Sequence, residues 1–377
     1  MKNRISFYIH IPFCDHKCIY CDFYSIINLE NRRYFLASLK REILNFKNIL
    51  GAERYVSTVF FGGGTPSLMG PDFISDILEV IYNNFKTLNE IEITLETNPG
   101  TVNKDVLQKY KNAGVNRLSI GVQSFHDKDL KFLTRIHDSS TAIKTINQSV
   151  EAGFENINVD LIFNLPNQTK DEWLENLQRV VNLPVTHISA YSLILERGTI
   201  LNKMVLDGKV KIGDVDYDAE LYETTIDFLT SNGFLQYEIS NFCKEGFECE
   251  HNLAYWNHCD YLGFGPSAHS FLNGKRWWNF SSLKRYISEI DKKGNAIRGE
   301  EELNRKELLE EFVMLALRSK GLDLVKLKNK FGSEWFESKK SIFKKLKNDQ
   351  LLIWNDDFIK FTPKGYSLCD EILLKIF

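Results

Sequence analysis

The sequence predicts an α/β protein whose larger part is an open, partial (β/α)6 barrel, followed by a smaller α+β domain. Three observations support this fold class. Short β-branched runs alternate with amphipathic segments over the first two-thirds of the chain. The connecting segments are long enough for the crossovers that parallel strands require. Six strands are fewer than the eight of a closed barrel, so we expect the sheet to stay open.

The first part of the chain alternates regularly between the two kinds of element. We expect strands at residues 6–11, 55–61, 91–96, 116–122, 156–163 and 187–194. We expect helices at residues 31–49, 71–86, 103–113, 127–131, 139–152 and 170–181. Polar residues follow all six strands, and sites in parallel β/α folds are built at that edge. We therefore expect one shared site there; the alternative is ordinary polar loop residues.

The last part of the chain predicts a separate domain. Residues 205–275 are expected to be helical and then loop-rich, and a charged segment at 281–306 leads onward. We expect domains at residues 1–280 and 281–377. The second domain is predicted to hold a long helix at 305–323 closed by Gly321, helices near 323–331 and 333–347, a β-hairpin turning at 355–357, and a helix at 363–377. This order of elements resembles a winged helix-turn-helix.

Composition narrows the class of protein. The formal net charge of −3 gives no electrostatic case for nucleic acid or an anionic membrane as the main partner. No run of about 18 apolar residues appears, so no membrane span is expected. The first residues are expected to form a strand, not a signal peptide. The seven cysteines are an odd number and three are crowded together, which favours a reducing cytoplasm and metal or redox chemistry.

Three cysteines lie within the stretch FCDHKCIYCDF, at Cys14, Cys18 and Cys21. Thiolates bind iron–sulfur clusters, and three thiolates leave one iron of a four-iron cluster open. The alternatives are zinc with a remote fourth ligand and three unrelated thiols. The scattered later cysteines are expected to be small packing residues, with a metal role for one of them as the alternative; they are Cys243, Cys249, Cys259 and Cys369.

A glycine run, FFGGGTPSL, follows the second predicted strand. Its glycines allow the backbone to approach a ligand closely, so its N–H and C=O groups can bind that ligand. The spacings of dinucleotide and P-loop fingerprints are missing from it. The alternative is a tight turn.

The CxxxCxxC loop at the end of the first strand, with Tyr20 before Cys21, resembles the radical S-adenosylmethionine (SAM) superfamily. That resemblance implies a [4Fe-4S] cluster on Cys14, Cys18 and Cys21, whose open iron takes the amino and carboxylate groups of SAM. The stretches IHIPFC, GGGTPS, LETNP, RLSIGVQSF, NVDLIFNLP and HNLAYW are similar to one branch, the anaerobic coproporphyrinogen III dehydrogenases (HemN type) and the related heme chaperones (HemW type).

The branch implies a set of SAM contacts in this chain. They are Tyr8, Tyr20, Gly63, Gly64, Thr65, Glu96, Gln123, Arg135, Asp160, Ser192 and His269. The chemistry agrees, because carboxylates accept from ribose hydroxyls or an amino group and a guanidinium pairs with a carboxylate. The alternative for Glu96 or Asp160 is a helix cap or a core hydrogen bond. His10, on the first strand, is expected to be structural.

Three features favour the heme chaperones within this branch. Asp22 and Phe23 follow the third cysteine, where the dehydrogenases carry a fourth cysteine one residue later, and the chain begins close to the first strand. The stretch HNLAYW is similar to the chaperones' own signature. His251 could ligate heme iron, and Tyr255 and Trp256 offer aromatic surface to a macrocycle. The alternatives are a hydrogen-bonded histidine in an aromatic core, or ligation by His258 or Cys259.

The resemblance implies a heme chaperone that delivers heme to an acceptor such as a respiratory cytochrome. The alternative function is an oxygen-independent coproporphyrinogen III oxidase in porphyrin biosynthesis. Nucleic-acid binding through the lysines of 326–347 is the third hypothesis and is not expected, because acidic residues interrupt that charge. A homodimer and peripheral membrane association through the acceptor stay open.

Overall fold

The structure is a computed structural model that describes residues 3–51 and 53–377. Its centre is a mixed, twelve-stranded sheet in the order β12-β11-β10-β9-β1-β2-β3-β4-β5-β6-β8-β7. The strands are β1 (Arg4–Ile11), β2 (Tyr55–Gly63), β3 (Lys86–Thr97), β4 (Arg117–Gln123), β5 (Asn156–Phe163), β6 (His187–Ser192), β7 (Leu235–Gln236), β8 (Asn241–Cys243), β9 (Tyr261–Phe264), β10 (His269–Leu272), β11 (Lys275–Asn279) and β12 (Ile297–Glu302).

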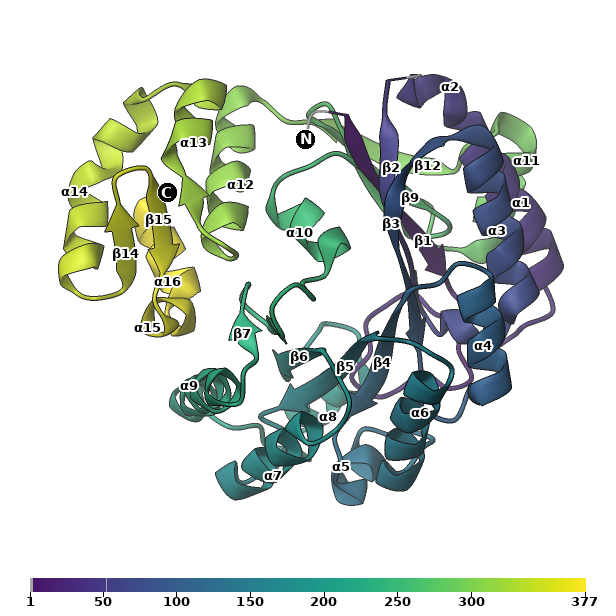
Figure 1. Cartoon of the computed structure of the whole chain (residues 1–377), viewed down its shortest axis with the longest axis horizontal. Coiled ribbons are helices and arrows are strands. Elements are labelled where there is room, and N and C mark those ends of the chain that lie inside the picture. Colours follow the sequence, from purple (N-terminus) through teal and green to yellow (C-terminus); the bar gives the residue numbers. More distant parts are fainter. Residues whose placement is uncertain (1–2, 52) are drawn as a thin grey trace.

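The sheet forms the partial barrel that the sequence predicts. Neighbouring strands from β1 to β6 are parallel, and all six predicted strands are confirmed. β12 and β7 stand at opposite ends of the strand order, so the sheet curves without closing. Figure 1 shows this curve around an inner space that holds α10 (Glu250–Trp256).

Helices cover the outer face of β1 to β6. They are α1 (Arg32–Asn45), α2 (Lys47–Leu50), α3 (Pro71–Asn84), α4 (Lys104–Asn112), α5 (Asp127–Phe132), α6 (Ser139–Glu151) and α7 (Lys170–Val181). Local sequence explains where several begin. The side chains of Asn103 and Asp138 accept from backbone N–H groups at the starts of α4 and α6. Thr169 and Glu172 form a capping box at the start of α7.

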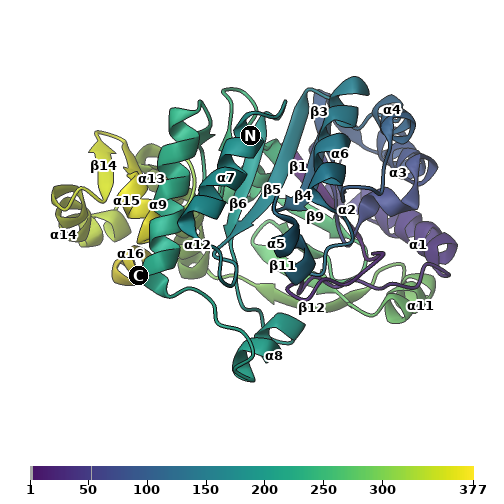
Figure 2. The same ribbon diagram turned by 90° about the horizontal axis from the view of Figure 1, so that it is seen from below.

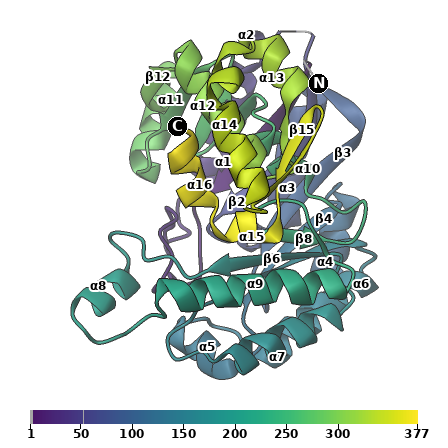
Figure 3. The same cartoon turned by 90° about the vertical axis from the view of Figure 1, so that its left-hand side faces the viewer.

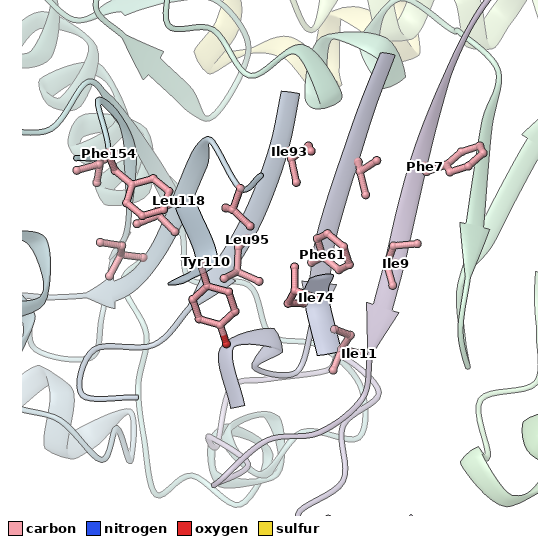
Figure 4. Packing of buried hydrophobic residues seen from close by; sticks show 14 of the residues in the cluster. Phe7, Ile9, Ile11, Phe61, Ile74, Ile93, Leu95, Tyr110, Leu118 and Phe154 are labelled. Atoms are coloured by element: carbon pink, nitrogen blue, oxygen red, sulfur yellow. The ribbon is translucent and has the colours of Figure 1, made fainter. Parts of the chain in front are cut away.

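Alternation along the strands divides the side chains between two faces. Phe7, Ile9 and Ile11 of β1 are fully buried in the layer beneath the outer helices (Figure 4). Burying each such side chain contributes roughly 1.5–3 kcal/mol. The alternate residues of β1, including Tyr8 and His10, point to the opposite face and line the inside of the barrel. The same strands therefore build both the core and the candidate site.

Residues 261–302 differ from the prediction of loops and a charged segment. They form β9 to β12 and α11 (Leu283–Lys293), and β9 pairs in parallel with β1. The four strands are only 4 to 6 residues long and carry little alternation. The charges of β12 are cross-strand partners, because Lys275 and Arg276 pair with Glu300 and Glu301. The sequence did not predict these strands because short strands rich in charged residues have the same composition as a polar linker.

The C-terminal residues form an α+β unit with its own core (Figure 3). Its elements are α12 (Arg305–Leu317), β13 (Leu322–Asp323), α13 (Leu324–Phe331), α14 (Glu334–Asn348), β14 (Leu352–Asn355), β15 (Phe358–Phe361), α15 (Pro363–Ser367) and α16 (Cys369–Ile376). The predicted hairpin is confirmed. The single helix expected at 363–377 is instead two, separated by Leu368. The domain limits at 280 and 281 stay a prediction; since β12 pairs with β11, we propose a limit near residue 303.

Two further helices complete the first part of the chain, α8 (Ile200–Leu206) and α9 (Val215–Ser231). α8 extends away from the body (Figure 2). Across the described residues, no helix is both long and apolar enough to cross a membrane.

The loop between β7 and β8 joins the sheet to the C-terminal unit. The Ile239 N–H donates to the Arg318 carbonyl (3.0 Å), and the Ser319 hydroxyl donates to the Tyr237 carbonyl (3.2 Å). Glu238 lies buried within this junction. It accepts from the Ser240 N–H at 3.2 Å, while its Oε1 has no hydrogen-bond partner. Burial raises the pKa of Glu238 to about 7.

We predict that Glu238 makes the junction less stable as pH rises. A carboxyl with a raised folded-state pKa contributes stability below its unfolded pKa and loses it as pH rises toward 7. Glu238→Gln, which stays neutral, should be more stable than the parent at pH 8, by on the order of 2 kcal/mol, and this gain should shrink at pH 5. Urea unfolding of both proteins at the two pH values measures it. Glu302→Gln, at an exposed carboxylate, is the control, and a pH-independent gain in Glu238→Gln would contradict the prediction.

Candidate functional site

The carboxyl ends of β1 to β6 converge on one cavity of about 460 Å³. Every one of the six ends contributes to its wall, so the strand ends share one cavity, as expected. The contributions from these ends are Cys14, Gly63, Gly64, Thr65, Glu96, Asn98, Gly121, Gln123, Asp160, Ile162, Tyr191 and Ser192. Cys18, Tyr20, Cys21 and Arg135 complete the predicted residues that line it.

The cysteine loop is held against the end of β2 by backbone hydrogen bonds. The Gly64 N–H donates to the Ile11 carbonyl (2.8 Å), and the Thr65 N–H donates to the Phe13 carbonyl (2.7 Å). The Cys14 N–H donates to the Ile26 carbonyl (3.0 Å), which closes the base of the loop. The loop is therefore a built extension of the sheet edge.

The glycine run makes this contact possible. A Cβ on Gly64 would lie 2.4 Å from the Phe13 carbonyl oxygen, and one on Gly63 would lie 2.8 Å from the His10 ring. Gly63 also has a φ of +114°, which favours glycine. Glycine is therefore required here by the close packing of β2 against β1 and the cysteine loop, whether or not these residues also contact a ligand.

Three thiols line one wall of the cavity, and all three are free. Throughout residues 3–51 and 53–377, no three His, Cys, Asp or Glu side chains meet closely enough to hold a single metal ion. A four-iron cluster needs a different arrangement, because each thiolate binds a different iron. Three cysteine thiols are the donor set that such a cluster takes, so the residues present fit it. Burial raises the pKa of the Cys21 thiol.

The later cysteines lie elsewhere. Cys243, Cys249 and Cys369 are buried and Cys259 is half-buried. Burial raises the pKa of both Cys243 and Cys249 to about 12, which keeps them protonated. They pack as small side chains, as expected.

Arg135 connects the cysteine loop with β3 and β4. One guanidinium nitrogen donates to the Asn98 side-chain oxygen and to the Gly121 carbonyl, each at 2.7 Å. The other lies 3.7 Å from the Cys18 sulfur. Its Nε is buried without a partner. A buried donor without an acceptor is rare, so Nε of Arg135 is a candidate donor to a ligand oxygen.

The inner wall carries two carboxyl groups. Glu96 accepts from the Gly63 N–H at 3.1 Å, and Asp160 accepts from the Asn158 amide at 2.8 Å. Burial, and after it the nearby Asp160, raises the pKa of Glu96 to about 8. Burial also raises the pKa of Asp160. Such carboxyl groups lie ready to accept from hydroxyl or amino groups of a ligand.

Tyr8 and His10 stand behind this wall. The Tyr8 hydroxyl is 3.1 Å from His10 Nδ1, and His10 Nε2 is 3.0 Å from the Tyr24 carbonyl. Burial lowers the pKa of His10 to about 4. His10 is structural, as expected. Tyr8 is beside Glu96, which helps to raise the pKa of Tyr8, but it does not line the cavity.

Two weaker sequence matches have different positions. Ser192 lines the cavity and donates to Asp218. His269 is exposed on β10 and stacks on Trp278, with ring centroids 5.9 Å apart. His269 is not brought into the cavity.

The HNLAYW stretch forms α10, which lies inside the barrel. His251 is 1% exposed and makes two side-chain hydrogen bonds, from Nδ1 to the Thr58 hydroxyl (2.7 Å) and from Nε2 to the Tyr255 hydroxyl (3.0 Å). Its ring packs on Phe60 with centroids 5.0 Å apart. Burial lowers the pKa of His251 to about 3, so the imidazole is neutral. This geometry matches the alternative of a hydrogen-bonded core histidine, and ligation would require Nε2 to leave Tyr255.

His258, the rival ligand, lies between the sheet and α12. Its side chain is 4% exposed, neither ring nitrogen has a hydrogen-bond partner, and Nε2 is 3.4 Å from Glu311. Its ring stacks on Phe271 at 4.8 Å. His258 is therefore separate from the main cavity.

Sequence reasoning gave no ligand-binding role to several residues that line the cavity, and Asn98 and Arg117 are two of them. Asn98 ends β3 and contacts Arg135, and its place in the LETNP stretch could have identified it. Arg117 is 2% exposed and lines the deep part of the cavity. It begins β4, at the end of the strand opposite the predicted site, so no strand-end signal pointed to it.

Comparison with known proteins agrees with this geometry. The family model described as radical SAM superfamily matches residues 8–180, and the HemN C-terminal domain model matches residues 303–368. The heme chaperone HemW of Bacillus subtilis strain 168 is 34% identical over 97% of this chain and 97% of its own length. A zebrafish (Danio rerio) relative, radical S-adenosyl methionine domain-containing protein 1, mitochondrial, is 33% identical over 98% of this chain and 86% of its own.

A solved structure extends the likeness to the whole fold. Coproporphyrinogen III oxidase (HemN) from Escherichia coli superposes with a TM-score of 0.85 and 26% sequence identity, covering 100% of this chain and 90% of that chain. The radical SAM fold and the HemN-type C-terminal part are therefore both present here.

We predict that a side chain at Gly64 displaces the cysteine loop. The Cβ of Gly64→Ala would meet backbone, which cannot move aside as a flexible side chain can. We expect a loss of about 1–3 kcal/mol in the free energy of unfolding, and faster amide hydrogen exchange at Thr65, whose N–H donates to Phe13. Gly246→Ala is the control for exchange at Thr65: its φ of +83° strains the new side chain, but nothing lies within 4 Å of the new Cβ, so it should lose stability while Thr65 exchanges as in the parent. Parent-like exchange at Thr65 in Gly64→Ala would contradict the prediction.

Proposed function

This chain belongs to the HemN/HemW branch of the radical SAM superfamily, and we propose that it is a heme chaperone that delivers heme to an acceptor protein. The observation that carries the proposal is the match over nearly the whole chain to the heme chaperone HemW of Bacillus subtilis. The superfamily implies a [4Fe-4S] cluster and SAM. A respiratory cytochrome as acceptor, membrane association through it, a homodimer and a cytoplasmic location are parts of the proposal.

The cluster would be held by Cys14, Cys18 and Cys21, whose thiols line the cavity. When bound, such a cluster would supply the one-electron chemistry with which this superfamily acts on SAM. The chain's own contribution is to hold the three thiolates on a loop fixed to β2 and to place Arg135 beside Cys18.

SAM would bind in the same cavity. Gly63, Gly64 and Thr65 offer backbone groups, and the Nε of Arg135 can meet a carboxylate. Glu96 and Asp160 can accept from amino or ribose hydroxyl groups. Tyr20, Gln123 and Ser192 complete the wall, and Tyr8 supports it from behind Glu96. His269 stays a prediction from resemblance alone, since it lies outside the cavity.

Heme would be ligated by His251 with Tyr255 and Trp256 beside it. A neutral imidazole is the form that binds metal, and the bond to Thr58 orients the ring. If Nδ1 donates to Thr58, Nε2 keeps its lone pair, which now accepts from Tyr255. Heme ligation by His251 would therefore require Nε2 to give up its hydrogen bond with the Tyr255 hydroxyl.

The cluster assignment is tested by anaerobic reconstitution. We expect the parent to take up about four iron and four sulfide per chain and to show the absorption of a [4Fe-4S] cluster. Replacing Cys14, Cys18 and Cys21 together by alanine should abolish this uptake. Cys369→Ala changes a buried cysteine of the C-terminal core and should keep it. Equal iron content in the triple variant and the parent would end the proposal.

The heme assignment is tested by heme titration of the same reconstituted material. His251→Ala should weaken heme binding at least tenfold, about 1.4 kcal/mol, because an axial ligand is lost. Thr58→Val keeps the imidazole and should cause a smaller loss. His258→Ala tests the rival ligand and should bind as the parent does. Parent-like affinity in His251→Ala would remove the role of His251.

A second candidate function is oxygen-independent oxidation of coproporphyrinogen III. The overall likeness to HemN of Escherichia coli favours it, as does the apolar rim of the cavity, where Phe23 and Ile194 are 61% and 66% exposed. Anaerobic incubation of the reconstituted protein with coproporphyrinogen III, SAM and a reductant decides between the two. We expect heme binding without protoporphyrinogen formation, and turnover would favour the oxidase.

A further inference from the structure

A chain of hydrogen bonds runs from Arg135 to one of the three thiols. Arg135 donates to the Asn98 side-chain oxygen at 2.7 Å, and the Asn98 amide donates to the Thr65 hydroxyl oxygen at 2.8 Å. The Thr65 hydroxyl is in turn 3.2 Å from the Cys14 sulfur. These hydrogen bonds thus join the end of β3, the glycine run and the cysteine loop through side chains alone.

The direction of this chain follows from the chemistry of its first member. A guanidinium only donates, so the Asn98 atom facing Arg135 must be the oxygen and the atom facing Thr65 must be the nitrogen. The Thr65 oxygen therefore accepts from Asn98. Its own hydrogen remains free to point at the Cys14 sulfur, and every bond in the chain then donates toward the thiol.

The Cys14 thiol makes a second hydrogen bond, and this one would be lost when the sulfur binds iron. The thiol donates to the His16 carbonyl at 3.0 Å. A thiolate on iron has no hydrogen to donate and can only accept. Thr65 is then the hydroxyl in place to donate to it.

The backbone around Asn98 fixes its position. The Thr101 N–H and hydroxyl donate to the Asn98 carbonyl, at 3.1 and 2.7 Å. A Cβ on Gly121 would lie 3.0 Å from the Asn98 side-chain oxygen, so a glycine on β4 leaves the room that Asn98 needs. Asn98 is held from three sides before any ligand enters.

We propose that Asn98 is a positioning residue that aims the Thr65 hydroxyl at the Cys14 thiolate and thereby raises the reduction potential of the bound iron–sulfur cluster. The inference rests on the proposed function, because it requires the cluster on Cys14, Cys18 and Cys21. Hydrogen bonds donated to a cysteine sulfur stabilise the more negative, reduced cluster. Removing the donor should therefore shift the potential to a more negative value.

Two nearly isosteric variants change the hydrogen bond to Cys14 while keeping the size of the side chain. Thr65→Val removes the hydroxyl. Asn98→Asp keeps the acceptor for Arg135 but replaces the donor facing Thr65 by a second acceptor, so the Thr65 hydroxyl turns toward the carboxylate and away from Cys14. Ser67→Ala is the matched control, since its hydroxyl lies two residues from Thr65 and bonds only to the hydroxyls of Thr97 and Thr101.

The measurement is a redox titration of each reconstituted protein, followed by electron paramagnetic resonance of the reduced cluster. We expect negative shifts in Thr65→Val and Asn98→Asp, and the parent's potential in Ser67→Ala and in the conservative variant Thr65→Ser. The negative charge that Asn98→Asp introduces also lowers the potential, so this substitution is repeated in the Thr65→Val background. Its shift there should be smaller, because the hydroxyl that it redirects is gone.

Iron and sulfide content, measured first, separates this inference from the proposed function. A parent without a cluster would overturn both. A parent with a cluster and an unchanged potential in Thr65→Val would overturn only the inference. Equal shifts from Asn98→Asp in the two backgrounds would do the same, since Asn98 would then act by charge alone. Loss of the cluster in Thr65→Val, with normal uptake in Thr65→Ser, would make the hydroxyl an assembly requirement and also reject the proposal.

Discussion

The docking of the cysteine loop on the glycine run is the contact on which the candidate site depends. Gly63 and Gly64 bring the end of β2 so close to β1 and to the loop that a single Cβ would meet the His10 ring of β1 or the Phe13 carbonyl. The backbone bonds made by Gly64 and Thr65 then set the height of the loop above the sheet. The Cys14 sulfur lies 3.2 Å from the Thr65 hydroxyl because this first contact is so short.

The inside of the barrel concentrates groups that are costly to bury. Glu96 and Asp160 both have raised pKa values from burial, and Arg117 and Arg135 each keep a buried Nε without a partner. Such groups destabilise a closed core, since a buried donor or carboxyl usually finds a full set of partners. Here they share one cavity, which is the expected arrangement where a polar ligand completes their hydrogen bonds.

The strand-end pattern was readable because parallel β/α units put every carboxyl end at one edge. Glu96, Gln123 and Asp160 could therefore be placed together from sequence spacing, and the cysteine loop followed from its motif. Residues whose position depends on long-range packing could not be placed from the sequence. Arg117 lines the cavity from the amino end of β4, and His269 lies exposed on β10, in a part of the sheet that the sequence did not predict. His251 was predicted as a heme ligand, yet it is buried inside the barrel and both of its ring nitrogens are hydrogen-bonded.

The position of α10 links the two chemistries that the sequence suggested separately. Asn252 lines the main cavity, while its neighbour His251 bonds to Thr58. Phe60 lines the same cavity and packs against the His251 ring. Iron can reach Nε2 of His251 only if Tyr255 moves, and the two residues share one short helix. A shift of that helix large enough to expose the imidazole would also move Asn252 in the cavity wall. The wall of the main cavity and the buried imidazole of His251 thus share one seven-residue helix.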